Sequence, residues 1–138
     1  MAFLLDTNVL SELRKRERCS PAVRAWFSLV EADDLYVSVL AVGEIRRGVE
    51  LLRRRDKRGA TALDRWLNEL ERQYADRILP VTLEICRIWG GMSLDRPLAP
   101  IDGLMAATAL HHRMTLVTRN VGDVERSGVD VLDPFAPP

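Results

Sequence analysis

The sequence has few of the residues on which disulfide-bonded and membrane-spanning proteins depend. Cys19 and Cys86 are the only cysteines among 138 residues, and they lie too far apart in the sequence for a metal-binding cysteine motif. We therefore expect two reduced thiols in ordinary packing. The longest stretch without a formal charge, 103–112, is much shorter than the roughly 18 apolar residues that cross a bilayer. We expect no membrane segment.

An excess of either charge is also missing. The 20 basic residues balance the 20 acidic ones, which argues against a broad basic surface that coats nucleic acid without specificity. No basic region followed by an apolar leader precedes Asp6, so we expect a cytoplasmic protein. The charge is locally uneven, because residues 44–58 carry seven basic and three acidic side chains.

The hydrophobic content of 47% is ample for a folded core, and the length suits one domain over 1–138. Short apolar runs predict buried strands at 2–5, 35–39 and 114–117 and weaker ones at 78–81 and 129–132. Between them, apolar residues recur every three or four positions, which predicts amphipathic helices; two such stripes are Leu63, Trp66, Leu67, Leu70, Tyr74 and Leu83, Cys86, Trp89, Met92. This alternation predicts a three-layer α/β domain with a mostly parallel central sheet flanked by helices.

Three carboxylates stand alone in apolar segments. Asp6 directly follows the first strand, Glu44 lies in the first turns of the helix after the second strand, and Asp102 lies in the first turn of the helix that Pro100 begins. Burying an unpaired carboxylate is costly. No basic residue lies next to any of them in its own apolar segment, so a distant residue or a bound cation must compensate the charge.

A fourth acid, Asp123, follows the strand at 114–117. The carboxyl ends of parallel strands share one edge of a sheet, where such folds bind ligands, so we expect the four acids to converge there. Oxygen ligands without His or Cys select Mg²⁺ or Mn²⁺. Taken singly, Asp6 is also explained as a helix cap, Asp102 as a partner of a helix dipole, and Asp123 as solvated surface.

Four segments in this order, 6–12, 44–48 with Ser38 before it, 102–107, and 118–120 with Asp123 after it, resemble the PIN-domain ribonucleases of the VapC toxin family, and most closely its FitB-like branch. The resemblance runs over about 3–135. It implies a PIN-like fold, an acidic pocket for Mg²⁺ or Mn²⁺ made by Asp6, Glu44, Asp102 and Asp123, and hydrolysis of RNA phosphodiester bonds. One departure is Val124, where the family commonly has Phe.

The polar residues around these acids suggest finer roles. We expect Asp6, Asp102 and Asp123 to bind the cation directly or through water, and Glu44 either to join them or to orient the attacking water. Other residues that we expect to position water or RNA are Asn8, Thr118, Asn120, Arg46, Arg47 and Arg119. His111 and His112 lie too far along their helix to join the site.

The resemblance also implies partners. These are an RNA substrate, a second copy of the chain in a homodimer, and a cognate antitoxin through which alone operator DNA would be bound. We expect a basic residue of the antitoxin to enter the acidic pocket in place of the cation.

Three alternatives stay open on the sequence alone. One is a metal-dependent phosphohydrolase with Asp6 as nucleophile, although such enzymes usually have a second Asp where this chain has Asn8. Another is a non-catalytic module that binds a basic peptide. The third is a nuclease that cleaves DNA, because the ligands would be the same.

Overall fold

The computed structural model describes residues 1–92 and 95–137. Its centre is a five-stranded, fully parallel sheet in the order β3-β2-β1-β4-β5. The strands are β1 Phe3–Leu5, β2 Leu35–Ser38, β3 Ile78–Leu79, β4 Thr115–Val117 and β5 Val131–Leu132. All five expected strands are confirmed. Pro80, which has no N–H for a ladder, lies just beyond β3, and β3 is an edge strand, where the loss matters least.

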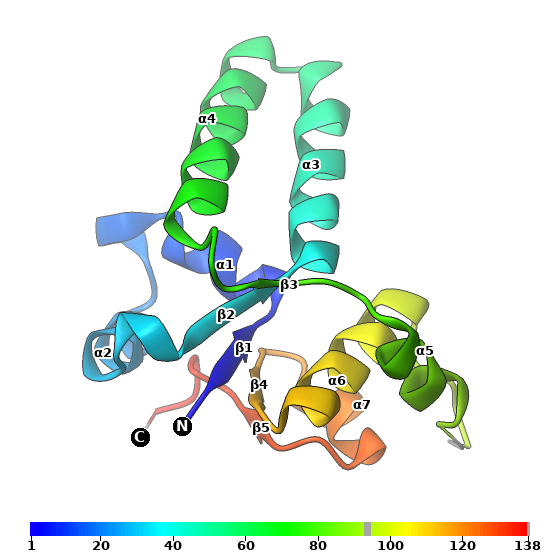
Figure 1. The fold of residues 1–138 in the computed structure, drawn as a ribbon. Coiled ribbons are helices and arrows are strands. Elements are labelled where there is room, and N and C mark those ends of the chain that lie inside the picture. The colour runs from blue at the N-terminus through cyan, green and yellow to red at the C-terminus, as the bar shows by residue number, and fades with distance from the viewer. Residues whose placement is uncertain (93–94, 138) are drawn as a thin grey trace.

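Helices cover both sides of this sheet, with α1 and α2 on one side and α5, α6 and α7 on the other (Figure 1). The helices are α1 Thr7–Leu13, α2 Pro21–Leu29, α3 Val39–Arg53, α4 Lys57–Gln73, α5 Leu83–Gly90, α6 Pro100–His112 and α7 Val121–Val124. The antiparallel pair α3 and α4 extends well beyond the sheet (Figure 1). None of the helices in the described part of the chain is long and apolar enough to cross a membrane.

Local sequence explains where several helices begin. The hydroxyl of Ser20 accepts a hydrogen bond from the backbone N–H of Val23 at the start of α2, and Pro21 occupies the first turn. Ser38 caps α3 in the same manner. Pro100 opens α6, as expected, although Ala99 before it supplies no side-chain cap. A proline fits the first turn because its missing N–H has no partner there anyway.

The core lies between the sheet and these helices. On α4, the expected stripe is confirmed, since Leu67 and Leu70 are buried and Tyr74 follows them into the core. On α5, the expected stripe is wrong. Ile85 is fully buried, whereas Leu83 is 65% exposed and Cys86 is exposed. Two neighbouring faces of α5 are apolar, and its packing against α6 decides which one is buried.

Candidate active site at the carboxyl edge of the sheet

Asp6 lies where the two central strands end. Leu5 and Val117 are paired in the ladder between β1 and β4, and the backbone N–H of Asp6 continues it by donating to the Val117 carbonyl at 2.9 Å. The next residue on the β4 side, Thr118, is fully buried and donates its hydroxyl to Asp6 Oδ2 at 2.7 Å. The strand register thus places these two side chains against each other.

Asn8 is a second polar residue that hydrogen-bonds to Asp6. The amide of Asn8 donates to Asp6 Oδ2 at 2.9 Å, and its Oδ1 accepts from the backbone N–H of Arg119 at 3.2 Å. The backbone N–H of Asn120 donates in turn to the hydroxyl of Thr118 at 3.0 Å. These bonds fasten the start of α1 to the loop after β4 and hold the Asp6 carboxylate in one orientation.

Glu44 approaches from α3. Its Oε1 accepts a hydrogen bond of 2.6 Å from the hydroxyl of Thr7, the first residue of α1. The backbone N–H of Thr7 donates to Asp6 Oδ1 at 2.8 Å. The sequence does not predict a contact between Thr7 and Glu44, because only the packing of α1 on α3 brings the two side chains together.

Asp102, in the first turn of α6, lies within electrostatic range of the other three acids. Burial raises the pKa of its carboxyl above the ordinary value, and the negative charges of three other residues raise it further. In decreasing order of effect these are Asp6, Glu44 and Asp123. No described residue donates a hydrogen bond to the Asp102 carboxylate. The fold therefore brings the four predicted acids into one region of negative potential with Asp102 uncompensated.

This arrangement fits a hard divalent cation. The donors are carboxylates joined by hydroxyl and amide groups, and a positive charge among them would relieve the penalty on Asp102. In this arrangement, no three Asp, Glu, His or Cys side chains of the described residues lie close enough together to hold a metal ion without rearrangement. Mg²⁺ tolerates such a site, because it keeps several of its waters and takes only one or two protein carboxylates directly.

Comparison with known proteins assigns the family. The model of the PIN domain matches residues 3–122. The chain belongs to the PIN domain family. A VapC ribonuclease of Sinorhizobium fredii is 32% identical over 98% of this chain and 99% of its own length. Toxin FitB of Neisseria gonorrhoeae is 33% identical over 96% of this chain and 98% of its own.

A solved structure agrees in fold with this PIN domain. The structure of FitAB bound to a DNA fragment superposes with a TM-score of 0.88 at 32% identity and covers 99% of this chain and 97% of that one. The predicted fold class, with its mostly parallel central sheet, is therefore confirmed. Asp6, Glu44 and Asp102 fall within the residues matched by the family model, and Asp123 comes one residue after them.

The predicted basic residues of this PIN domain lie in different surroundings. Arg47 lines an open hollow together with Glu44, one of the four acids. Arg46 instead forms an ion pair of 2.6 Å with Asp64 of α4. Arg119 is exposed and its guanidinium stacks 4.3 Å from the ring centre of Phe135. Of the three, Arg47 is the one that the structure brings beside an acidic site residue.

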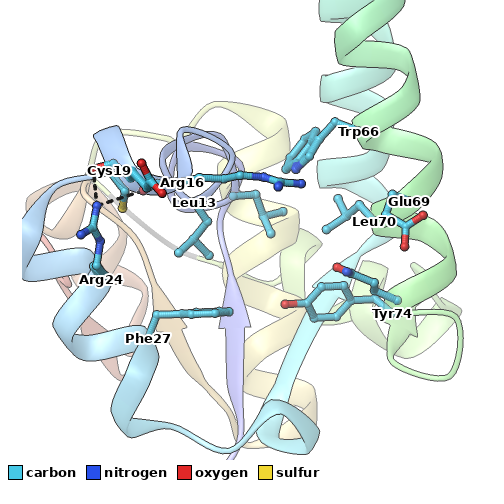
Figure 2. A pocket seen from close by; sticks show the side chains of 12 residues that line it. Leu13, Arg16, Cys19, Arg24, Phe27, Trp66, Glu69, Leu70 and Tyr74 are labelled. Carbon is cyan, nitrogen blue, oxygen red and sulfur yellow. Dashed lines mark hydrogen bonds between the residues drawn. The ribbon is translucent and has the colours of Figure 1, made fainter.

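A separate groove lies between α1 and α2 on one side and α4 on the other. It has a volume of about 530 Å³. Figure 2 shows Leu13 and Phe27 facing Trp66, Leu70 and Tyr74 across it. Phe27 is 38% exposed. This PIN domain therefore has an apolar groove formed by elements other than those that carry Glu44 and Asp102.

Proposed function

We propose that this protein is the toxin of a type II toxin–antitoxin system and a Mg²⁺- or Mn²⁺-dependent endoribonuclease. The observation that carries this proposal is the convergence of four acids at the carboxyl edge of the sheet with Asp102 uncompensated. The names of the relatives, VapC ribonuclease and Toxin FitB, support the same activity.

In this proposal Asp6, Asp102 and Asp123 hold the cation directly or through water, and Glu44 joins them or orients the attacking water. When bound, the cation would neutralise charge on the phosphate and lower the pKa of water. Thr118 and Asn8 fix the orientation of Asp6. Arg47 and Arg119 attract the RNA backbone, which the acids alone would repel. Arg46 and Asn120 keep the role expected from the sequence, which is to position RNA or water.

Water is a better nucleophile here than Asp6 itself. Both oxygens of Asp6 already accept hydrogen bonds, Oδ1 from the Thr7 backbone and Oδ2 from Thr118 and Asn8. A carboxylate held by three donors is a weak nucleophile, because attack would break these bonds. This geometry favours the hydrolytic nuclease over the phosphohydrolase with a covalent intermediate.

The direct test is incubation of the purified protein with a mixed RNA pool, with Mg²⁺ and with EDTA, followed by mapping of the cut ends. We expect cleavage with Mg²⁺ only, and a loss of at least a hundredfold in Asp102→Asn. Glu84→Gln, an exposed change on α5, is the control. Equal cleavage by Asp102→Asn at saturating metal would refute the site, and a single-stranded DNA pool tests whether DNA is cut instead.

We further propose that a cognate antitoxin binds the apolar groove between α1, α2 and α4, and that operator DNA is bound only through that complex. The similar protein FitAB has been solved bound to a DNA fragment, which supports the second part of this proposal. The groove is suited to an amphipathic segment whose apolar residues pack on Phe27, Leu70 and Tyr74. The RNA substrate and the antitoxin would both be present in the cytoplasm, so we place the activity there.

The groove proposal is tested with Phe27→Glu, which puts a charge into the apolar groove. We expect the affinity for the co-purified antitoxin to fall at least tenfold, because a desolvated carboxylate would face apolar residues. Leu29→Glu is the matched control, since Leu29 lies on the same helix and is 84% exposed without lining the groove. Equal antitoxin affinity in both variants, measured by titration calorimetry, would place the interface elsewhere.

A further inference from the structure

Thr7 contacts two of the four acids at once. Its backbone N–H donates to Asp6 Oδ1 at 2.8 Å, and its side-chain hydroxyl donates to Glu44 Oε1 at 2.6 Å. The two acids come from different elements, Asp6 from the end of β1 and Glu44 from α3. Thr7 is therefore a direct hydrogen-bonded link between the strand edge and α3 in the site.

This link works against electrostatic repulsion. Asp6 and Glu44 carry like charges in one region, and both add to the negative potential at Asp102. Like charges at short range drive flexible side chains apart unless donors hold them. Asp6 is held by Thr118 and Asn8 as well. For Glu44, Thr7 is the one hydrogen-bond donor among the described residues.

We propose that Thr7 is a positioning residue that holds Glu44 beside Asp6 in the orientation required for cation binding. The inference rests on the proposed metal-dependent function and adds a residue to it. The hydroxyl holds Oε1 of Glu44, and Oε2, which accepts no hydrogen bond from the described residues, would face the cation or its water. Without the hydroxyl, the Glu44 side chain is free to turn away from the other acids. Part of the free energy of cation binding must then be used to bring the Glu44 carboxylate back beside them, which weakens the observed binding.

The test compares Thr7→Val, which has the same shape without a hydroxyl, with Thr7→Ser, which keeps the hydroxyl. Binding of Mn²⁺ to each purified protein is measured by titration calorimetry without RNA. We expect the dissociation constant to rise about tenfold in Thr7→Val, the loss usual for residues that orient metal ligands. Thr7→Ser should stay within about twofold of the unchanged protein, because it preserves the same donor.

A double substitution shows whether Thr7 acts through Glu44. In Glu44→Gln, the further change Thr7→Val should weaken Mn²⁺ binding by less than about twofold, since the partner carboxylate is already gone. Full additivity would overturn the proposal, and so would unchanged Mn²⁺ binding in Thr7→Val or a loss in Thr7→Ser equal to that in Thr7→Val.

Two further measurements keep the outcomes separate. Thermal unfolding identifies a Thr7→Val protein that has lost its fold, in which case Thr7→Ala, which adds no methyl group against Glu44, replaces it in the same comparison. RNA cleavage is followed in parallel. If Mn²⁺ binding responds as expected but the unchanged protein cleaves no RNA, then the ribonuclease proposal fails while the role of Thr7 stands.

Discussion

At the scale of single residues, Asp6 and Asp102 differ in the hydrogen bonds that their carboxylates accept. Asp6 accepts hydrogen bonds on both oxygens, from Thr7, Asn8 and Thr118. Asp102 receives none from the described residues, and burial together with neighbouring charge raises the pKa of its carboxyl. The two acids should therefore differ in what they contribute to stability, even though both are needed for catalysis in the proposed function.

This difference predicts opposite effects of neutralising each acid in the absence of metal. Asp102→Asn should raise the free energy of unfolding by about 1 kcal/mol, because it removes a partly buried charge without a partner. Asp6→Asn should lower it by about 1 to 2 kcal/mol, because the new amide nitrogen turns a donor toward existing donors. Urea unfolding in EDTA at neutral pH measures both changes. The same sign in both variants would contradict this assignment.

Glu12 is a structural acid outside the site. Its side chain is only 11% exposed, and its carboxylate accepts from the backbone N–H of Ser20 at 2.8 Å and from Lys15 Nζ at 3.0 Å. These contacts, chiefly the backbone hydrogen bond, lower the pKa of the Glu12 carboxyl below its usual value. Because Ser20 caps α2, Glu12 fixes the start of that helix against the end of α1.

The lowered pKa predicts a pH dependence of stability. An acid whose pKa is lower in the folded state stabilises the fold above its unfolded-state pKa, and this contribution disappears as the pH falls through the folded-state pKa. Glu12→Gln should therefore lower Tm at pH 7 by roughly 6 °C, for a loss of about 2 kcal/mol. The difference from the unchanged protein should shrink as acid is added. Glu84→Gln, whose ion pair is exposed, should change Tm little at any pH, and a Glu12 effect that persists in acid would argue against the carboxylate.

Among the helices, the close approach of α5 to α6 depends on Gly103. A Cβ atom at this position would lie 2.8 Å from two atoms of the Trp89 ring. Gly103 directly follows Asp102 in the first turns of α6. The missing side chain therefore lets the indole of Trp89 rest on the part of α6 that carries a site acid.

Gly103→Ala should lower the free energy of unfolding by about 1 kcal/mol. The clash with Trp89 costs about 1 to 3 kcal/mol, and it outweighs the gain of up to about 1 kcal/mol that alanine gives a helix. RNA cleavage should fall as well, because the displaced α5 or α6 moves Asp102. Gly48→Ala in α3, where an added Cβ meets nothing within 4 Å, is the control and should stabilise. Equal stability changes in the two alanine variants would show that Trp89 moves without cost.

On the surface of the molecule as a whole, a mainly apolar hollow remains open beside Glu44. It is lined by Val39, Leu51 and Ile101 together with Glu44 and Arg47. The three apolar side chains are 41%, 48% and 37% exposed. Such exposure of neighbouring large apolar residues is characteristic of a surface that another protein covers.

We expect the predicted homodimer to form through the apolar part of this hollow, with a second copy of the chain covering Val39, Leu51 and Ile101 and leaving Glu44 and Arg47 accessible to RNA. Sedimentation at about 10 μM should show a dimer, since a stable interface of standard size holds at that concentration. Leu51→Glu should give a monomer with its fold intact, whereas Leu29→Glu, on the far helix α2, should remain dimeric. A monomer in the unchanged protein would refute the homodimer, and a dimeric Leu51→Glu would move the interface to another face.

Much of this protein follows from its sequence alone. Apolar runs predicted all five strands, Pro100 predicted the start of a helix, and isolated carboxylates predicted three of the acids that converge. These features are local, because strand burial, capping and the cost of an uncompensated charge depend on residue type and near neighbours. The alternating pattern predicts the class of fold, but it does not predict the order of the strands in the sheet.

Contacts between residues distant in the chain depended on the fold instead. Packing buried Ile85 rather than Leu83 and Cys86 on α5, since both faces carry apolar residues and only α6 selects between them. It paired Arg46 with Asp64 and brought Thr7 to Glu44, 37 residues later. No period or spacing encodes such contacts, because they arise from how helices pack on the sheet. The sequence thus predicted the four acids, whereas the tertiary structure determined which residues, such as Thr7 and Thr118, hydrogen-bond to them.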